Sequence, residues 1–139
     1  MKILLSNQYL AGAERIVVEA IILYKNIPIK ERLLVDTGSP YTMISEKRLQ
    51  KSVRLPNLEV CGSIQLGGIN VPYKNAGQVN IQLFDKEVAD IKSFDIDLYL
   101  LCFAPNYLPY ISSFIGKDFI DKYNLAISKK DPTGLRYLE

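Results

Sequence analysis

Apolar and polar residues alternate along most of this chain with the short period that is typical of strands. The clearest stretch is Val-Asn-Ile-Gln-Leu at residues 79–83. Because successive side chains of a strand point to opposite faces, this pattern predicts a strand with one buried face. Residues 15–24 are rich in Ile and Val, and a Lys-Asn turn at residues 25–26 separates them from an apolar stretch at residues 27–29, which predicts a hairpin. Further strands are expected at residues 33–35, 58–66, 71–73, 78–84, 97–103, 125–127 and 135–137.

Helical signals are few and short. Residues 44–49, with Ser45 as a candidate N-cap, predict a short helix or turn. Residues 117–123 predict a helix near the C-terminus, in which Asp118 would favour the first turn. Asn124 follows where a left-handed C-cap residue is common. The whole pattern predicts a compact all-β barrel with one short C-terminal helix.

Composition points to one ordinary domain. The chain has 139 residues, of which 48% are apolar and 10% aromatic, so residues 1–139 are expected to share one core. The net charge is +2, with opposite charges interspersed. No basic stripe with interleaved aromatic residues stands out, which argues against nucleic acid as a partner. The densest basic run, at residues 47–54, is interpreted as one solvated helical face rather than a phosphate-binding patch.

The chain has no histidine, and this excludes several kinds of active site. Serine and cysteine nucleophile systems need an imidazole to carry a proton, and zinc hydrolases use imidazole ligands as a rule. The two cysteines, Cys61 and Cys102, lack the close spacing of a metal site. We therefore expect no metal and no cofactor. For the cysteines a disulfide stays open, although two buried thiols are commoner in a chain without an export signal.

The sequence gives no sign of a targeting or membrane-spanning segment. The apolar stretch within residues 1–5 is too short for the core of a signal peptide. No apolar run approaches the length of a membrane span. These observations favour a cytoplasmic protein with no membrane partner.

Residues 33–39 carry the most specific chemical signal. They read Leu-Leu-Val-Asp-Thr-Gly-Ser, so a predicted buried strand runs directly into a carboxylate, a small hydroxyl residue and a glycine. Burying a carboxylate at a strand end is costly unless the fold supplies partners for it, which suggests a function for Asp36. From average residue usage, we expect this pattern by chance in roughly one of ten thousand chains of this length.

The Asp-Thr-Gly triplet at residues 36–38 resembles the catalytic motif of the aspartic proteases. A second element of that family, two apolar residues and a glycine before a short helix, matches the Phe-Ile-Gly triplet at residues 114–116, which ends 80 residues beyond Asp36 (116 − 36). The Asp-Thr-Gly motif occurs once in a short chain, so the resemblance is to the retroviral-type (retropepsin-like) branch. It implies a closed acid-protease-type β-barrel, one domain per subunit of a two-fold dimer. The implied activity is that of an aspartic endopeptidase acting on peptide or protein substrates.

The resemblance also assigns roles around the motif. Asp36 would meet its equivalent in a second subunit, because two carboxyls about 3 Å apart share one proton and can act as acid and base on a water molecule. Thr37 would brace the two loops across the dimer axis. Gly38 would allow a sharp turn and offer its N–H to Asp36. Two interpretations of Ser39 stay open: a hydroxyl that donates to the carboxylate and lowers its pKa, hence a more acidic activity optimum, or an ordinary Ser-Pro turn.

The family covers its substrate cleft with a glycine-tipped hairpin, the flap. Residues 62–70 lie where a flap belongs, with Gly67 and Gly68 as the expected tip and Ile69 as a neighbouring substrate contact. The Asn-Ala-Gly segment at residues 75–77 is a rival tip. An ordinary hairpin turn is the alternative interpretation of the whole segment.

One further feature of the chain is expected to match the family, and two features depart from it. Gly116 is expected to pack beneath the loop that carries Asp36, where a side chain would not fit. Retroviral members commonly pair an acid after the triplet with an arginine after the apolar-apolar-glycine element, but this chain has Pro40 and Lys117 there. The viral dimer is held by interleaved N- and C-terminal strands, whereas here a hairpin is expected beyond the last helix. The sequence therefore leaves the interface strands open.

Three other functions compete with the peptidase. The main alternative is a catalytically weak retropepsin-fold module for dimerisation or peptide binding, although a scaffold has no need of a paired acid. A phosphate loop of the sugar-kinase or actin type shares an Asp-x-Gly-[ST] pattern, but it needs two ATP-enclosing lobes and 139 residues are too few. An aspartyl-phosphate nucleophile fails because its family places Lys between Asp and Thr.

Overall fold

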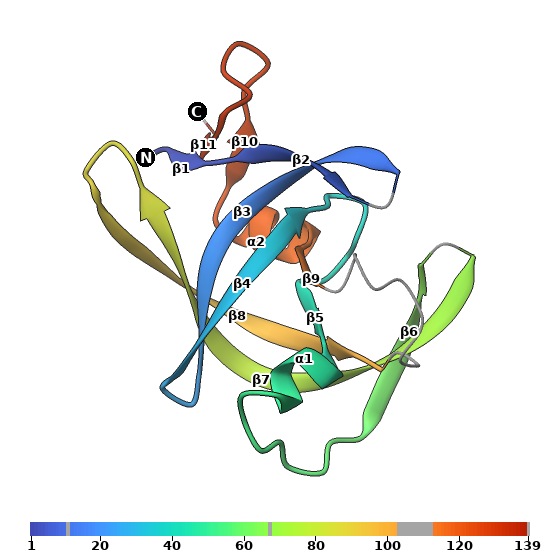
Figure 1. Ribbon diagram of the computed structural model, residues 1–139. Coiled ribbons are helices and arrows are strands. Elements are labelled where there is room, and N and C mark those ends of the chain that lie inside the picture. Colours follow the sequence, from blue (N-terminus) through green and yellow to red (C-terminus); the bar gives the residue numbers. More distant parts are fainter. Residues whose placement is uncertain (11, 67, 103–112, 139) are drawn as a thin grey trace.

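The computed structural model describes residues 1–10, 12–66, 68–102 and 113–138, and most of them lie in strands, which confirms the all-β class (Figure 1). The elements in chain order are β1 (Ile3–Leu4), β2 (Ser6–Leu10), β3 (Ala13–Tyr24), β4 (Ile27–Val35), β5 (Met43–Ser45), α1 (Glu46–Gln50), β6 (Val60–Leu66), β7 (Ile69–Asp85), β8 (Asp90–Leu101), β9 (Ser113–Ile115), α2 (Lys117–Lys122), β10 (Leu125–Ile127) and β11 (Gly134–Tyr137).

The strands pair in a ring. From β7, hydrogen-bonded neighbours run through β8, β5, β9, β4 and β3, and β3 pairs again with β7. Within this ring β9 is parallel to β4, with Leu34 opposite Phe114 and Val35 opposite Ile115. The ring therefore brings together the two sequence motifs that lie 80 residues apart (116 − 36).

Two clusters of buried side chains pack inside this arrangement. The main cluster includes the fully buried Leu33, Leu98 and Phe119. The second cluster consists of Val17, Leu34, Met43, Val71, Leu101 and Phe114, with Tyr41, Ile64, Leu66, Ile69, Tyr73 and Tyr99 packed against it. Neighbouring strand residues point to opposite faces, so Leu33 enters one cluster and Leu34 the other. The end of β4 is thus buried on both faces, as its apolar run predicts.

The β3–β4 hairpin forms where the sequence predicts it. Lys25 and Asn26 both have positive φ angles, 47° and 66°, which a two-residue turn between twisted strands requires. The pairing continues without interruption from Tyr24 opposite Ile27 to Val17 opposite Leu34. The two short strands expected after the turn are therefore one strand, β4.

β7 is also longer than the sequence suggests. The strands expected at residues 71–73 and 78–84 are parts of one strand that runs from the tip of the β6–β7 hairpin to Asp85. The register against β8 shifts between Asn75 and Gln78, and Gly77 has a φ of 86°. This irregularity is a β-bulge, which explains a positive-φ glycine without a turn. The prediction of a rival flap tip at residues 75–77 is wrong.

The helices and the C-terminal hairpin match their predictions closely. α1 starts after Ser45, although the Ser45 hydroxyl makes no capping hydrogen bond. α2 is followed by Asn124 with a φ of 53°, the left-handed conformation expected of a C-cap residue. β10 and β11 then pair antiparallel, with Ala126 opposite Arg136.

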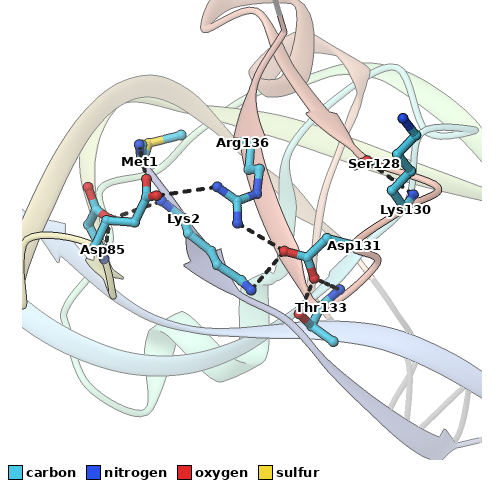
Figure 2. Close-up of polar contacts among 9 residues, drawn as sticks. Met1, Lys2, Asp85, Ser128, Lys130, Asp131, Thr133 and Arg136 are labelled. Atoms are coloured by element: carbon cyan, nitrogen blue, oxygen red, sulfur yellow. Dashed lines mark hydrogen bonds and ion pairs between the residues drawn. The ribbon is translucent and has the colours of Figure 1, made fainter.

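A polar network ties the first residues to the C-terminal hairpin (Figure 2). Lys2 donates its backbone N–H to the buried Asp85 Oδ1 at 3.0 Å, and its ammonium contacts Asp131 Oδ2 at 2.8 Å. Arg136 contacts the same Asp131 oxygen at 2.9 Å and Glu87 Oε2 at 3.4 Å. β1 pairs directly with β11 and with Asp85 of β7. Both chain ends therefore belong to one continuous sheet.

Two further sequence expectations concern the cysteines and the membrane. Both thiols are free, with Cys61 exposed and Cys102 half-buried, so the disulfide left open by the sequence is not formed. Burial raises the pKa of the Cys102 thiol. None of the helices in the described ranges is both long and apolar enough to span a membrane.

Candidate functional site

The Asp36 loop, residues 36–42, begins where β4 leaves the ring. The Asp36 backbone N–H donates to the Ile115 carbonyl at 2.9 Å, which extends the parallel pairing of β4 with β9 by one step. The side chains of Asp36 and Thr37 are exposed in the single chain. The carboxylate is therefore not buried in the single chain, contrary to the expectation from the strand that precedes it. The expected bracing by Thr37 stays a prediction.

Gly38 holds the Asp36 carboxylate in place. Its N–H donates to Asp36 Oδ1 at 3.0 Å, as predicted. A Cβ at this position would lie 3.2 Å from the same oxygen. Hydrogen bonds to a charged acceptor are stronger than neutral ones. Glycine therefore lets the backbone approach closely enough to orient one carboxylate oxygen and leaves the other edge of the group toward solvent.

Ser39 does not contact the carboxylate. Its side chain is buried, and its hydroxyl donates to the Tyr41 carbonyl at 2.9 Å. The prediction of a hydroxyl that lowers the Asp36 pKa is therefore wrong, and the expected shift to a more acidic optimum loses its basis. The interpretation of Ser39 as part of a Ser-Pro turn is the one that the hydrogen bond supports.

Gly116 lies directly beneath the Asp36 loop, as predicted. A Cβ there would lie 2.2 Å from the Tyr41 carbonyl oxygen and 2.9 Å from that of Ser39. The next two residues bind the loop through their backbones: Lys117 N–H donates to Ser39 O at 2.7 Å, and Asp118 N–H to Pro40 O at 3.2 Å. The loop is thus seated on the junction of β9 and α2, with no room for a side chain between them.

Thr42 is a positioning residue that sequence reasoning missed. Its fully buried hydroxyl donates to Asp118 Oδ1 at 2.8 Å and accepts the Gly116 N–H at 3.2 Å. Asp118 Oδ1 also accepts the Phe119 N–H of the first helical turn, the place where the sequence put it. Thr42 directly precedes β5, and its partners lie 76 and 74 residues along the chain, so no local sequence signal marks this residue.

Pro40 and Lys117, which stand where the resemblance to viral proteases would place an acid and an arginine, make other contacts. The Lys117 ammonium pairs with Asp121 at 2.5 Å, four residues along α2, and Pro40 offers only its carbonyl to the helix. The Asp36 loop is instead held to α2 by backbone hydrogen bonds and by the Thr42–Asp118 contact.

The expected flap segment is a hairpin made by β6 and β7. Leu66 pairs with Ile69 across its tip, and Gly68 has a φ of 79°. Gly67, the other expected tip residue, lies outside the described residues. Ile69 is half-buried and, with Ile64 and Leu66, packs against the second cluster that contains Leu34. One face of the hairpin therefore lies over apolar side chains that also support the end of β4.

Three tyrosines connect the Asp36 loop to the base of this hairpin. The Tyr41 ring centroid lies 4.4 Å from that of Tyr99 and 5.5 Å from that of Tyr73. Burial raises the pKa of the Tyr73 hydroxyl, and a hydrogen bond with Tyr41 raises it further. Burial also raises the pKa of Tyr99. The three rings thus form an aromatic group packed against the second cluster.

Two apolar hollows lie elsewhere on the surface. One, of about 360 Å³, is lined by residues of β1, β2, β3 and β7, among them Leu4, Val18 and Phe84. The other, of about 270 Å³, is also lined by Phe84, together with Ile21 and Ile91. Neither is lined by the Asp36 loop. In the described ranges, no group of three or more acidic or cysteine side chains is placed to hold a metal ion.

Comparison with known proteins adds no assignment to this geometry. No protein-family model matches the chain, and no curated protein sequence is significantly similar to it.

Proposed function

We propose that this protein is an aspartic endopeptidase that works as a homodimer. The observation that supports it best is the presentation of Asp36, an exposed carboxylate oriented by the Gly38 N–H on a loop that is seated on Gly116. A surface carboxylate with no function does not need a loop fixed by three backbone hydrogen bonds to another part of the chain. The resemblance of the two motifs to retropepsin-like proteases points to the same activity.

One Asp36 is not sufficient for peptide hydrolysis. One carboxylate must accept a proton from water while a second, protonated carboxyl donates to the peptide carbonyl. A two-fold dimer supplies the second group from an identical loop. Two carboxyls at such short range share one proton and titrate as a pair. The exposure of Asp36 in the single chain agrees with this proposal, because the second subunit would cover it.

The substrate in this proposal is an extended peptide bound between the Asp36 loop and the β6–β7 hairpin. Backbone groups of the hairpin would bind the peptide main chain as strands bind one another. Half-buried apolar residues of the hairpin that pack against the second cluster, Ile64, Leu66 and Ile69, would contact the side chains of the peptide. Gly68 gives the tip the backbone freedom that opening and closing over a substrate requires.

Cleavage of a mixed peptide library at pH 3 to 7 tests the proposal. The wild type is compared with Asp36→Asn, which keeps the size of the side chain and an acceptor for Gly38 N–H but removes the acid. Asp90→Asn is the matched control, since Asp90 is an exposed carboxylate at the β7–β8 turn. We expect cleavage by the wild type and the control, and a loss of at least about a thousandfold in Asp36→Asn, as for removal of a central catalytic group.

The alternative is a peptide-binding module with the same fold. The observation that favours it is that one chain supplies a single Asp-Thr-Gly motif and therefore one Asp36 carboxylate. Such a module would bind peptides between the Asp36 loop and the hairpin and release them intact. A verified dimer that cuts no peptide at any pH would establish the module, whereas cleavage that survives Asp36→Asn would place the chemistry elsewhere in the chain.

A further inference from the structure

The C-terminal hairpin has one paired edge and one free edge. β11 lies between β1 and β10, and β10 is the last strand in the order of the sheet. Within the described ranges, no strand pairs with the far side of β10. Figure 1 shows the hairpin at one end of the molecule, next to β1. An unpaired strand edge is a ready template for another strand.

The free edge presents the backbone groups of Leu125 and Ile127. Leu138 N–H donates to the Asn124 carbonyl at 2.7 Å, so this carbonyl points toward β11. Because the peptide bond is planar and trans, the Leu125 N–H must point the opposite way. Along an antiparallel strand the direction of the backbone N–H and C=O groups then alternates from residue to residue. The backbone groups of Leu125 and Ile127 therefore point to the free side, and those of Ala126 point to β11.

The termini, in contrast, are already paired inside one chain. Ile3 lies opposite Leu135 and Leu4 opposite Gly134. Leu5 N–H donates to the Thr133 carbonyl at 2.9 Å. An exchange of N-terminal strands between subunits would have to break these contacts and the polar network of Figure 2. The edge of β10 can be used without breaking any of them.

We infer that the β10 edge is the subunit interface, where it pairs antiparallel with the β10 edge of a second copy. This inference rests on the proposed function, because the candidate site holds one carboxylate and is incomplete without that copy. The result is one sheet that runs through both subunits in the order β1-β11-β10 and then β10-β11-β1 of the partner.

The register of this pairing follows from the free groups. A two-fold axis through Ala126 sets Leu125 opposite Ile127 of the partner subunit, and both pairs exchange two hydrogen bonds. Ala126 then lies opposite Ala126 of the partner subunit as a non-hydrogen-bonded pair, with Cα atoms about 4.5 Å apart. The side chains of Leu125 and Ile127 pack on the main cluster, so Ala126 points to the other face. Its small size suits a position on the axis.

The interface and the candidate site are joined by a short rigid element. α2 precedes β10 and spans six residues, about 9 Å. At its start, the backbones of Lys117 and Asp118 hold the Asp36 loop. Pairing at β10 would therefore fix the position of each loop relative to the axis through one helix and its cap.

Disulfide trapping tests the inference. Cys61 and Cys102 are replaced by serine, and Ala126→Cys is added. A cysteine on the axis meets its equivalent at a Cα separation that a disulfide can bridge. Lys129→Cys is the matched control, because this exposed residue of the same hairpin lies off the axis. After oxidation with oxidised glutathione, we expect a shift from monomer to disulfide-linked dimer for Ala126→Cys and no shift for Lys129→Cys.

The outcomes separate this inference from the proposed function. A dimer seen by sedimentation velocity that Ala126→Cys fails to trap overturns the interface but leaves the peptidase standing. A trapped dimer that cuts no peptide confirms the interface and contradicts the peptidase. A chain that is monomeric at every concentration overturns the interface.

A second pair of variants tests the same register without a covalent bond. Ala126→Glu places two like charges opposite each other on the axis, whereas Ala126→Gln places two neutral side chains of the same size there. We expect a severalfold larger dissociation constant for Ala126→Glu than for Ala126→Gln, with the difference reduced by salt. Equal dissociation constants would argue against the register.

Discussion

At the scale of single residues, the Asp36 loop depends on positions where a side chain is absent. Gly116 leaves space for the carbonyls of Ser39 and Tyr41, and Gly38 lets an N–H reach the Asp36 carboxylate. Neither glycine has a positive φ angle. Their role is therefore close approach of backbone to backbone or to carboxylate, rather than access to an unusual conformation.

Gly116→Ala is predicted to damage the loop. The new Cβ would lie 2.2 Å from the Tyr41 carbonyl oxygen, so the loop or β9 must move. Overpacking of this kind costs about 1–3 kcal/mol of unfolding free energy. Because the displaced loop carries Asp36, we also expect the Gly116→Ala variant to lose most of its peptide cleavage. Urea unfolding and the library assay measure the two effects.

Gly12→Ala serves as the control for that variant. Gly12 has a φ of 79° and open space around its would-be Cβ. An L-residue in that conformation costs about 1–2 kcal/mol, a comparable loss of stability. Cleavage should nevertheless stay at the wild-type level once the protein is folded. Full activity in Gly116→Ala would show that the seat beneath the loop is not needed.

At the scale of elements, the β6–β7 hairpin is fastened at its base through Gly62 and Tyr73. A Cβ at Gly62 would lie 2.5 Å from the Tyr73 hydroxyl oxygen. The Tyr73 ring cannot retreat freely, because Tyr41 and Tyr99 contact it at centroid distances of 5.5 Å. The two strands therefore meet with a glycine on one and a large ring on the other.

Gly62→Ala is predicted to cost about 1–3 kcal/mol of unfolding free energy, because the alanine and the ring compete for the same space. In a Tyr73→Leu background that cost should shrink, which makes the two substitutions non-additive. Gly68→Ala at the hairpin tip is the comparison, since it has nothing within 4 Å and its cost should be the same in both backgrounds. Additive costs for Gly62→Ala and Tyr73→Leu in chemical denaturation would contradict this packing.

The strands and helices of this fold show which structural features the sequence alone can predict. The Lys25–Asn26 turn and the Asn124 C-cap were predictable because each depends on the φ angle of a residue and its neighbours. Gly77 was misread, because a positive-φ glycine suits a bulge as well as a turn and only the pairing with β8 distinguishes them. The Ser39 hydroxyl bonds only two residues along the chain, and the sequence left this turn open as one of two interpretations. The bridge made by Thr42, in contrast, depends on how the segment before β5 meets Gly116 and Asp118, more than 70 residues away. Local patterns do not contain that information.

At the scale of the whole molecule, acidic groups hold the two chain ends together. The Lys2 ammonium, then the Thr133 hydroxyl and Arg136, hold the pKa of Asp131 far below its usual range. The backbone N–H of Lys2 is the main cause that lowers the pKa of Asp85. The N-terminal ammonium does the same for Glu87. These carboxylates bind protons more weakly in the folded state than in the unfolded state.

Stability is therefore predicted to fall in acid. A depressed carboxyl pKa contributes stability that is fully present above the unfolded-state value, about 3.9 for Asp, and is lost as the pH falls through the folded-state value. We expect the unfolding free energy in urea to be constant above about pH 5 and to decrease below about pH 4. Asp85→Asn should lower the stability near pH 7 and flatten this decrease.

Asp97→Asn, on the exposed side of β8, is the control for the acid series. It removes a carboxylate that takes no part in the network of Figure 2. Its unfolding free energy should follow the wild-type dependence on pH. An unchanged acid slope in Asp85→Asn would mean that the network of the chain ends does not set the acid limit of the fold.

The pairing of β1 with β11 inside one chain has a kinetic consequence. Each chain closes its own terminal sheet, so the two subunits of the proposed dimer would separate without unfolding. Subunits would then exchange between dimers at the rate of dissociation, not at the much slower rate of unfolding. An Asp36→Asn copy added to wild-type protein would draw active subunits into mixed pairs that lack one acid. Each Asp36→Asn chain would in this way inactivate a folded wild-type chain with which it pairs.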